Sequence, residues 1–298
     1  MFTNVGDKFF SLRSELDYRT SCWQHGKKLP KLAASDRVIL DSIKRDGIHI
    51  TNLTELGLNS TSQLLNSAYS LLPSMGTANY RSSTQNPPEI YIVTDLPAFY
   101  NWGREQRLFN IIENYIGLPV AYHGVHLRKD FANTEQFQTL LWHRDIEDRR
   151  VLKIIVYLND VEEKHGPFEY VPISLISRSQ AYRIKRQIKN LGGIDDQTLN
   201  KIVPKSAWKS CPGPAGTVIF ADTRRILHHG TLRTEERSTL FFVYTANPPK
   251  RPELCTHYWD NTYPRPNLNR EFDELKSPIR EGMGLKEEGR AIVPVFAE

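Results

Sequence analysis

The stretch LLWHRDIEDRRVLKIIVYLND, residues 140–160, decides the fold. It joins a polar segment containing a His-x-Asp triplet, His143 and Asp145, to the apolar run VLKIIVYL. A run this rich in Val, Ile, Leu and Tyr is typical of a buried strand. In an extended segment, residues i and i+2 point to the same side. The imidazole of His143 and the carboxylate of Asp145 are therefore able to converge on one point.

Further β-rich runs lie on both sides of this stretch, separated by Gly, Pro, Asn and Asp. They are AYHGVHLRKDF (121–131), PFEYVP (167–172), GTVIFAD (216–222) and STLFFVYTA (238–246). A basic helical stretch, about 175–191, and a loop through Trp208 interrupt the series. Helices followed by antiparallel strands with one insertion predict an α+β fold built on a β-sandwich or open barrel.

The N-terminal third has apolar residues at helical spacing over 38–43, 64–72 and 108–116, and one short apolar run, IHITNL (48–53). These patterns predict three helices and a strand. From Lys250 the chain is polar and rich in proline, and we expect an irregular tail that wraps the body. We expect one domain over 1–298: N-terminal helices over about 1–118, a core over about 119–249 with an insertion at about 174–210, and a tail over about 250–298.

Composition excludes several classes of protein. Hydrophobic residues make up 39% and charged residues 24% of the chain, which is ordinary for a globular protein and unlike disordered or collagen-like chains. No apolar run approaches the roughly 20 residues that span a bilayer, and early charges interrupt any signal-peptide core. The net charge of +5 is mild for this length, so we expect neither a membrane nor a nucleic-acid partner. Three scattered cysteines without a C-x-x-C pair favour a reducing, cytoplasmic location: Cys22, Cys211 and Cys255.

A second histidine is needed to complete the 2-His-1-carboxylate face that is typical of non-haem Fe(II) oxygenases. The segment GTVIFADTRRILHHGTLRTEERSTLFFVY (216–244) supplies two candidates, His228 and His229, directly after a predicted strand. Arg237 and Thr239 follow at the start of the next strand. A fixed guanidinium with a neighbouring hydroxyl suits bidentate capture of a carboxylate. Each signal is weak alone, and their order along the chain strengthens them together.

From about Val125 to Pro249 the chain resembles the phytanoyl-CoA dioxygenase-like family of non-haem Fe(II)/2-oxoglutarate-dependent oxygenases. The matching pieces are HRDIEDRRVLKIIVYLNDV (143–161), HGPFEYVP (165–172), GTVIFADTRRILHHG (216–230) and ERSTLFFVY (236–244). The resemblance implies a double-stranded β-helix core, the jelly roll also found in cupins. It also implies that His143, Asp145 and a distal histidine are iron ligands and catalytic residues, and that Arg237 binds the far carboxylate of 2-oxoglutarate.

The resemblance implies a dioxygenase that uses Fe(II), 2-oxoglutarate and O2 to hydroxylate, or otherwise oxidise, an unactivated C–H bond. The expected partner is a small-molecule substrate, a metabolite or biosynthetic intermediate. Related halogenases lack the carboxylate ligand, so Asp145 favours hydroxylation, desaturation or cyclisation over halogenation. Two alternatives stay open: the same chemistry on a carrier-bound or protein substrate, and a non-enzymatic jelly-roll protein that binds a ligand.

The double histidine leaves two candidates for the third ligand. In relatives the ligand often lies two residues before a glycine, which matches His228 and Gly230. Some members have the histidine directly before the glycine, which would favour His229. We prefer His228, with His229 as a supporting or substrate-facing group.

Further candidates surround this core set. Lys153 and Tyr157 lie on the strand after the His-x-Asp triplet, and Arg128 lies on the strand before it; each either faces the cofactor or belongs to the core or surface. Trp142 is a candidate wall of the substrate pocket. The basic helix of the insertion either is a solvated surface or lies over the barrel mouth, where Arg183 and Arg186 would contact an anionic substrate.

Overall fold

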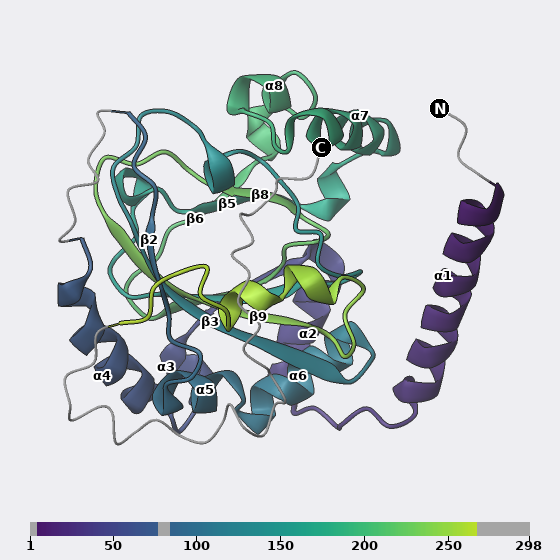
Figure 1. The fold of residues 1–298 in the computed structure, drawn as a ribbon, viewed down its shortest axis with the longest axis horizontal. Helices are drawn as coiled ribbons and strands as arrows, with labels where there is room; N and C mark the ends of the chain where they lie inside the picture. Colours follow the sequence, from purple (N-terminus) through teal and green to yellow (C-terminus); the bar gives the residue numbers. More distant parts are fainter. Residues whose placement is uncertain (1–4, 77–83, 267–298) are drawn as a thin grey trace.

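A computed structural model describes residues 5–76 and 84–266, and two antiparallel sheets form its centre (Figure 1). The larger sheet has the strand order β1-β7-β4-β9-β3-β2 and the smaller has the order β6-β5-β8. The strands are β1 (Ile48–Asn52), β2 (Glu89–Ile92), β3 (Val120–Asp130), β4 (Leu152–Tyr157), β5 (Phe168–Val171), β6 (Lys209–Cys211), β7 (Thr217–Asp222), β8 (Leu227–Gly230) and β9 (Arg237–Ala246).

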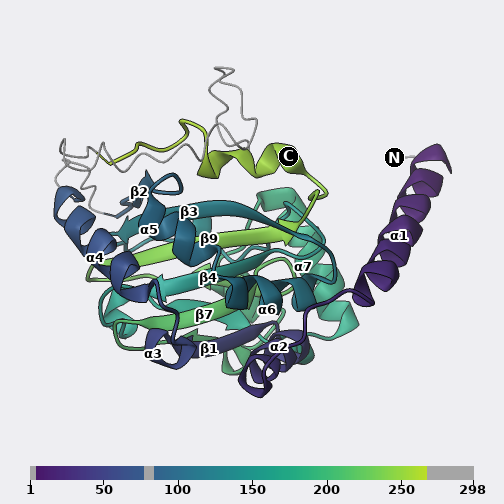
Figure 2. The same cartoon turned by 90° about the horizontal axis from the view of Figure 1, so that it is seen from below.

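Helices α2 to α6 lie across one face of the larger sheet, as Figure 2 shows, whereas α1 lies at the side of the body, where Glu15 pairs with Arg149 and His25 with Glu113. Gly47 and Gly117 end α2 and α6 with φ of 83° and 77°, a left-handed conformation that glycine adopts without steric cost. The helices are α1 (Val5–Gly26), α2 (Ala34–Asp46), α3 (Leu53–Leu56), α4 (Thr61–Leu71), α5 (Pro97–Gly103), α6 (Gln106–Ile116), α7 (Arg178–Leu191) and α8 (Asp196–Asn200).

Alternation along the central strands divides the interior into two cores. On β4, Leu152, Ile154 and Val156 pack in the cluster shared with the helices, whereas Ile155 and Tyr157 pack in the cluster between the two sheets. This is the period-two pattern of a strand that is buried on both faces. The inner face of the larger sheet therefore faces the smaller sheet, and side chains on that face line the space between them.

The α+β class and the double-stranded β-helix core are confirmed, with differences in detail. Three short strands were not predicted: β2, β6 and β8. The last of these, LHHG, holds both candidate histidines and has only four residues, too few for an alternating pattern to be recognised. The division into the predicted segments of one domain stays a prediction.

The segment that follows β9 turns back over β3 (Figures 1 and 2). It contains two 3-10 turns, η6 (Pro252–Leu254) and η7 (Thr256–Tyr258). The Tyr258 ring stacks on His126 of β3, with ring centroids 4.1 Å apart. Residues 250–266 of the expected tail are described, the remainder, 267–298, lies outside the described residues, and the wrapping tail as a whole stays a prediction. Within the described ranges, no helix is both long and apolar enough to cross a bilayer.

Candidate metal centre

Two of the candidate metal ligands are paired through their backbones. His143 lies in the segment before β4 and His228 lies on β8, and the two residues form an antiparallel bridge. The His143 N–H donates to the His228 carbonyl at 3.0 Å, and the His228 N–H donates to the His143 carbonyl at 3.1 Å. The ring centroids are 4.3 Å apart. Residues about 85 positions apart in the chain are therefore held side by side by main-chain hydrogen bonds.

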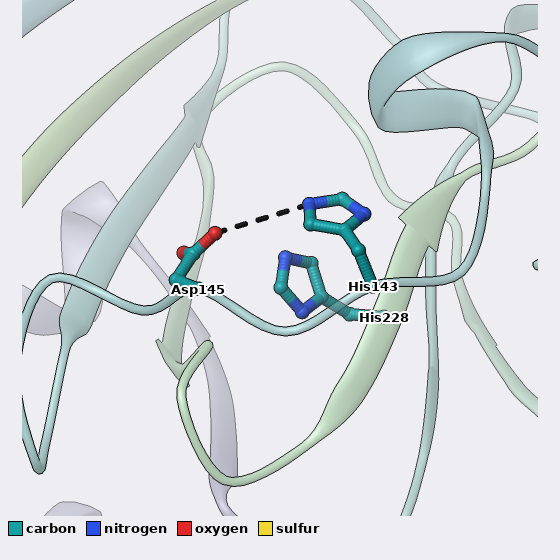
Figure 3. A group of neighbouring side chains, drawn as sticks. All are labelled: His143, Asp145 and His228. Atoms are coloured by element: carbon teal, nitrogen blue, oxygen red, sulfur yellow. Dashed lines mark ion pairs between the residues drawn. The ribbon is translucent and has the colours of Figure 1, made fainter. Parts of the chain in front are cut away.

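Asp145 completes a group of three potential ligands (Figure 3). One ligand atom each from His143, Asp145 and His228 lies within 4.8 Å of the others. His143 Nε2 is 3.9 Å from Asp145 Oδ1. Across residues 5–76 and 84–266, no other set of three His, Cys, Asp or Glu side chains converges in this way. Two imidazoles and one carboxylate are the donors of a facial-triad iron site.

The protonation states suit metal binding. Burial lowers the pKa of His143 despite the nearby Asp145 carboxylate. Burial, and then the neighbouring His143, hold the pKa of His228 well below its usual range. Both rings are therefore neutral at pH 7 and have a lone pair to offer. His143 Nδ1 is 2.7 Å from the carbonyl of Leu141, which fixes the proton on Nδ1 and leaves Nε2 free for a metal.

Lys153 provides the counter-charge for Asp145. It lies on the inner face of β4, and its Nζ is 2.7 Å from Asp145 Oδ2. Burial, the largest single effect, would raise the pKa of Asp145, but the Lys153 ammonium together with the neighbouring His228 and His143 lowers that pKa. The reciprocal attraction raises the pKa of Lys153 against the effect of its own burial. The carboxylate is thus ionised and its Oδ1 faces the two histidines.

A second charged cluster lies farther along the inner face. Asp130, at the end of β3, accepts hydrogen bonds from Arg237 at 3.0 and 3.2 Å and from Arg128 at 2.8 Å. Arg233 Nη1 is 2.8 Å from the same carboxylate. Burial would raise the pKa of Asp130, but the three guanidinium groups lower it strongly. Two buried guanidinium groups, Arg233 and Arg237, and the partly buried Arg128 surround one anion, which leaves an excess of positive charge at this end of the inner face.

Two neighbouring features fit a carboxylate ligand at this cluster. The Oγ1 atom of Thr239 is buried and has no hydrogen-bond partner within the described chain. A Cβ atom at Gly230 would lie 3.0 Å from Arg233 Nη2 and 3.5 Å from Arg237 Nη2, so the absence of a side chain leaves room for the guanidinium groups. Gly230 is two residues after His228 on the same face of β8, and strand geometry separates such residues by about 7 Å. The guanidinium groups beside Gly230 are therefore about two residues along the strand from the triad.

Other predicted site residues do not face the triad. Trp142 and His229 point to the opposite side of the strand pair and stack on each other, with centroids 3.8 Å apart. Tyr157 faces the interior, but its hydroxyl donates to the Cys211 carbonyl at 2.9 Å and accepts from the Phe168 N–H at 3.1 Å. The Tyr157 hydroxyl therefore has its hydrogen-bond partners within the core and does not need a ligand to supply them.

Arg183 and Arg186 are exposed on α7. The opposite face of α7 inserts Ile184 into a cluster with Val171 and Leu227, which are on the outer face of the smaller sheet. The basic helix therefore covers the outside of that sheet, near β5 and β8 in Figure 1. It does not bring Arg183 or Arg186 to the triad.

The prediction missed Asp130 and Arg233. The spacing Arg128-x-Asp130 on a strand places both side chains on one face, and this signal was available in the sequence. Arg233 lies in the loop between β8 and β9, and only its approach to Asp130 across the fold reveals it.

No family model matches the chain. No curated protein matches it in sequence. Among solved structures, it is similar to HygX from Streptomyces hygroscopicus with nickel and 2-oxoglutarate bound, at a TM-score of 0.52 and 15% identity over 73% of this chain and 88% of that one.

Two further structures give TM-scores of 0.49. EctD from S. alaskensis with bound Fe is 18% identical over 74% of this chain and 79% of that chain. AviO1 from Streptomyces viridochromogenes Tue57 is 16% identical over 74% of this chain and 98% of that chain. Of these three similarities, the one to HygX exceeds a TM-score of 0.5, and at its low identity it shows a shared fold. The resemblance expected from the motifs is confirmed at the level of the fold.

Proposed function

We propose that this protein is an Fe(II)- and 2-oxoglutarate-dependent dioxygenase that oxidises an unactivated C–H bond of a small molecule. The observation that carries the proposal is the convergence of His143, Asp145 and His228 on the inner face of a double-stranded β-helix. Two neutral imidazoles and one ionised carboxylate leave open positions on a six-coordinate metal. Those positions would accept 2-oxoglutarate and O2.

The surroundings of the triad support 2-oxoglutarate as the cosubstrate. The Arg237 cluster offers excess positive charge, and Thr239 offers an unpartnered hydroxyl. A carboxylate bound there would accept charge-assisted hydrogen bonds, which are stronger in a buried site than in water. HygX, which shares the fold, binds nickel and 2-oxoglutarate in its crystal structure.

The roles of the residues in the reaction follow from their positions. Iron, when bound, would supply the oxidising chemistry, with 2-oxoglutarate decarboxylated to succinate as O2 is consumed. His143 and His228 would hold the metal through neutral rings, and Asp145 would offset part of its charge. Lys153 would hold Asp145 Oδ2 and leave Oδ1 for the metal. Arg237 and Thr239 would orient the cosubstrate by its distal carboxylate.

The test is succinate release under defined conditions. The protein is loaded anaerobically with Fe(II) and 2-oxoglutarate, exposed to O2, and screened against metabolite pools and carrier-bound acyl groups. The proposal predicts O2-dependent succinate that rises with a true substrate and vanishes in Asp145→Ala. Binding of ligands without any succinate in the loaded protein would favour the non-enzymatic jelly-roll alternative. Stimulation by carrier-bound substrates alone would change the substrate class and keep the reaction.

A further inference from the structure

The insertion between β5 and β6 contacts the metal-ligand segment from outside the barrel. Trp142, directly before His143, forms an antiparallel bridge with Ile194 of the insertion. The two N–H···O distances are 2.8 and 3.0 Å. His143 forms its own bridge with His228 on the other side. Residues 142–143 are therefore the middle of a small three-stranded arrangement, with the insertion at one edge and β8 at the other.

The two backbones approach closely at this edge. A Cβ atom at Gly193 would lie 2.8 Å from Leu141 Cβ and 3.4 Å from the Trp142 carbonyl oxygen. Only a residue without a side chain allows that contact without displacement. The insertion is thus fitted against the ligand-bearing segment.

One carboxylate of the insertion fixes the residues behind the ligands. Asp196 Oδ1 accepts hydrogen bonds from Trp142 Nε1 and from Gln136 Nε2, both at 2.8 Å. The Asp196 N–H donates in return to Gln136 Oε1 at 2.9 Å. The Trp142 ring, fully buried, then stacks on His229, the residue after His228. A continuous set of contacts therefore runs from Asp196 to both histidine ligands.

His229 anchors the other end of this set. Its Nδ1 is 2.8 Å from the Leu140 carbonyl and its Nε2 is 2.9 Å from Glu169 Oε2. Glu169 lies on β5, so the stack is tied to the smaller sheet as well as to the insertion. Groups that orient metal ligands in this way commonly change metal affinity when they are removed.

We propose that Asp196 is a positioning residue for the metal centre, which sets the geometry of His143 and His228 through Trp142. The proposal rests on the proposed metal-binding function. It assigns the insertion a role in building the metal site from outside the barrel. A loosened Trp142 would let the 142–143 backbone move relative to β8, and the two imidazoles would lose their shared alignment.

The test measures Co(II) binding by calorimetry and the visible absorption of the bound Co(II), which reports ligand geometry. Asp196→Ala is expected to lower Co(II) affinity about tenfold and to shift the Co(II) bands. Asp196→Asn keeps an acceptor oxygen for Trp142 and Gln136, so affinity and spectrum should return towards those of the unaltered protein. Trp142→Phe keeps an aromatic ring but removes the indole N–H donor. The loss of Co(II) affinity in the double variant should therefore be no larger than the loss in Asp196→Ala alone.

Asp195→Ala is the matched control. Asp195 is adjacent in sequence but caps α8, accepting from the Thr198 N–H at 2.6 Å. Its loss should lower the free energy of unfolding and leave Co(II) affinity and spectrum unchanged. The proposal is overturned if Asp196→Ala binds Co(II) like the unaltered protein, or if Asp195→Ala causes an equal loss. Failure of the unaltered protein to bind Co(II) would instead overturn the proposed function, and this proposal with it.

Discussion

At the scale of single residues, the site combines groups that are satisfied by the fold with groups that are not. The Tyr157 hydroxyl has both a hydrogen-bond donor and an acceptor as partners, whereas the hydroxyl of Thr239 on β9 is buried and has no hydrogen-bond partner within the described chain. A buried polar atom without a partner costs stability. A bound ligand that hydrogen-bonds to the hydroxyl would offset this cost. We therefore use Thr239 to test the proposed position of the cosubstrate.

Thr239→Val tests this directly, because it removes the hydroxyl and nearly keeps the shape. Without 2-oxoglutarate, we expect the free energy of unfolding to rise by about 1 kcal/mol, since a desolvated hydroxyl is lost. The affinity for 2-oxoglutarate should fall about tenfold or more, as for the loss of a hydrogen bond to a charged group. Urea unfolding and calorimetric titration measure the two effects.

Thr245→Val on the same strand is its control. The Thr245 hydroxyl is buried but bonded, to the Ala246 carbonyl at 2.9 Å and to His123 Nε2 at 2.6 Å. Its removal should lower stability and leave 2-oxoglutarate affinity unchanged. Opposite signs of the two stability changes support the assignment. Unchanged cosubstrate affinity in Thr239→Val would remove Thr239 from the proposed site.

How far the sequence predicts these residues depends on the range of the interaction. The i, i+2 spacing of His143 and Asp145 predicts a shared face, and the two side chains do converge. The preference for His228 over His229 rested on its spacing from Gly230, because the four residues of β8 give too little pattern to predict a strand. Arg233 became visible only through its contact with Asp130, which depends on the loop geometry.

At the scale of elements, long patterned segments were predicted well and their placement was not. The basic helix was expected within about 175–191 and is α7, Arg178–Leu191. Its position depends on which side of the smaller sheet offers an apolar surface. The outward side chains Val171 and Leu227 offer that surface, and Ile184 covers them. Periodicity gives the apolar face of a helix, but the partner of that face is set by the tertiary fold.

Charge reversal on α7 tests this placement. In the variant with Arg183, Lys185 and Arg186 all replaced by Glu, we expect the affinity for the substrate that stimulates succinate release to be unchanged, as well as the affinities for metal and 2-oxoglutarate, because the helix lies outside the smaller sheet. Titrations at low salt give the most sensitive comparison, since charge effects there are least screened. A marked loss of affinity for that substrate at low salt, which recovers at high salt while 2-oxoglutarate affinity stays unchanged, would contradict the placement and restore a role over the barrel mouth.

At the scale of the whole molecule, histidines inside the fold make the free energy of unfolding depend on pH. Burial, and then the charge of His257, lower the pKa of His123 to about 4. The same residue in the unfolded chain titrates near 6.5. Between these values the unfolded chain binds a proton that the folded chain does not. Stability from this group is therefore present above pH 6.5 and is lost as the pH falls towards 4.

In His123→Asn, the free energy of unfolding should fall less steeply as the pH decreases from 6.5 to about 4. One such histidine contributes at most about 1.4 kcal/mol per pH unit to the slope of the free energy of unfolding against pH. Urea unfolding of the metal-free protein at several pH values between 4 and 7 measures it, and the slope rather than the absolute stability is compared. Parallel curves for the variant and the unaltered protein would contradict the assignment.

The central claim is that His143, Asp145 and His228 form an iron site that also binds 2-oxoglutarate. An anaerobic titration with Fe(II) and then 2-oxoglutarate, followed by visible charge-transfer absorption, tests it most directly. The account predicts one iron per chain and a band that develops only after 2-oxoglutarate is added. The band should be absent in His228→Ala and present, at weaker metal affinity, in His229→Ala. No band in the unaltered protein, or the reverse pattern in the two variants, would contradict the account.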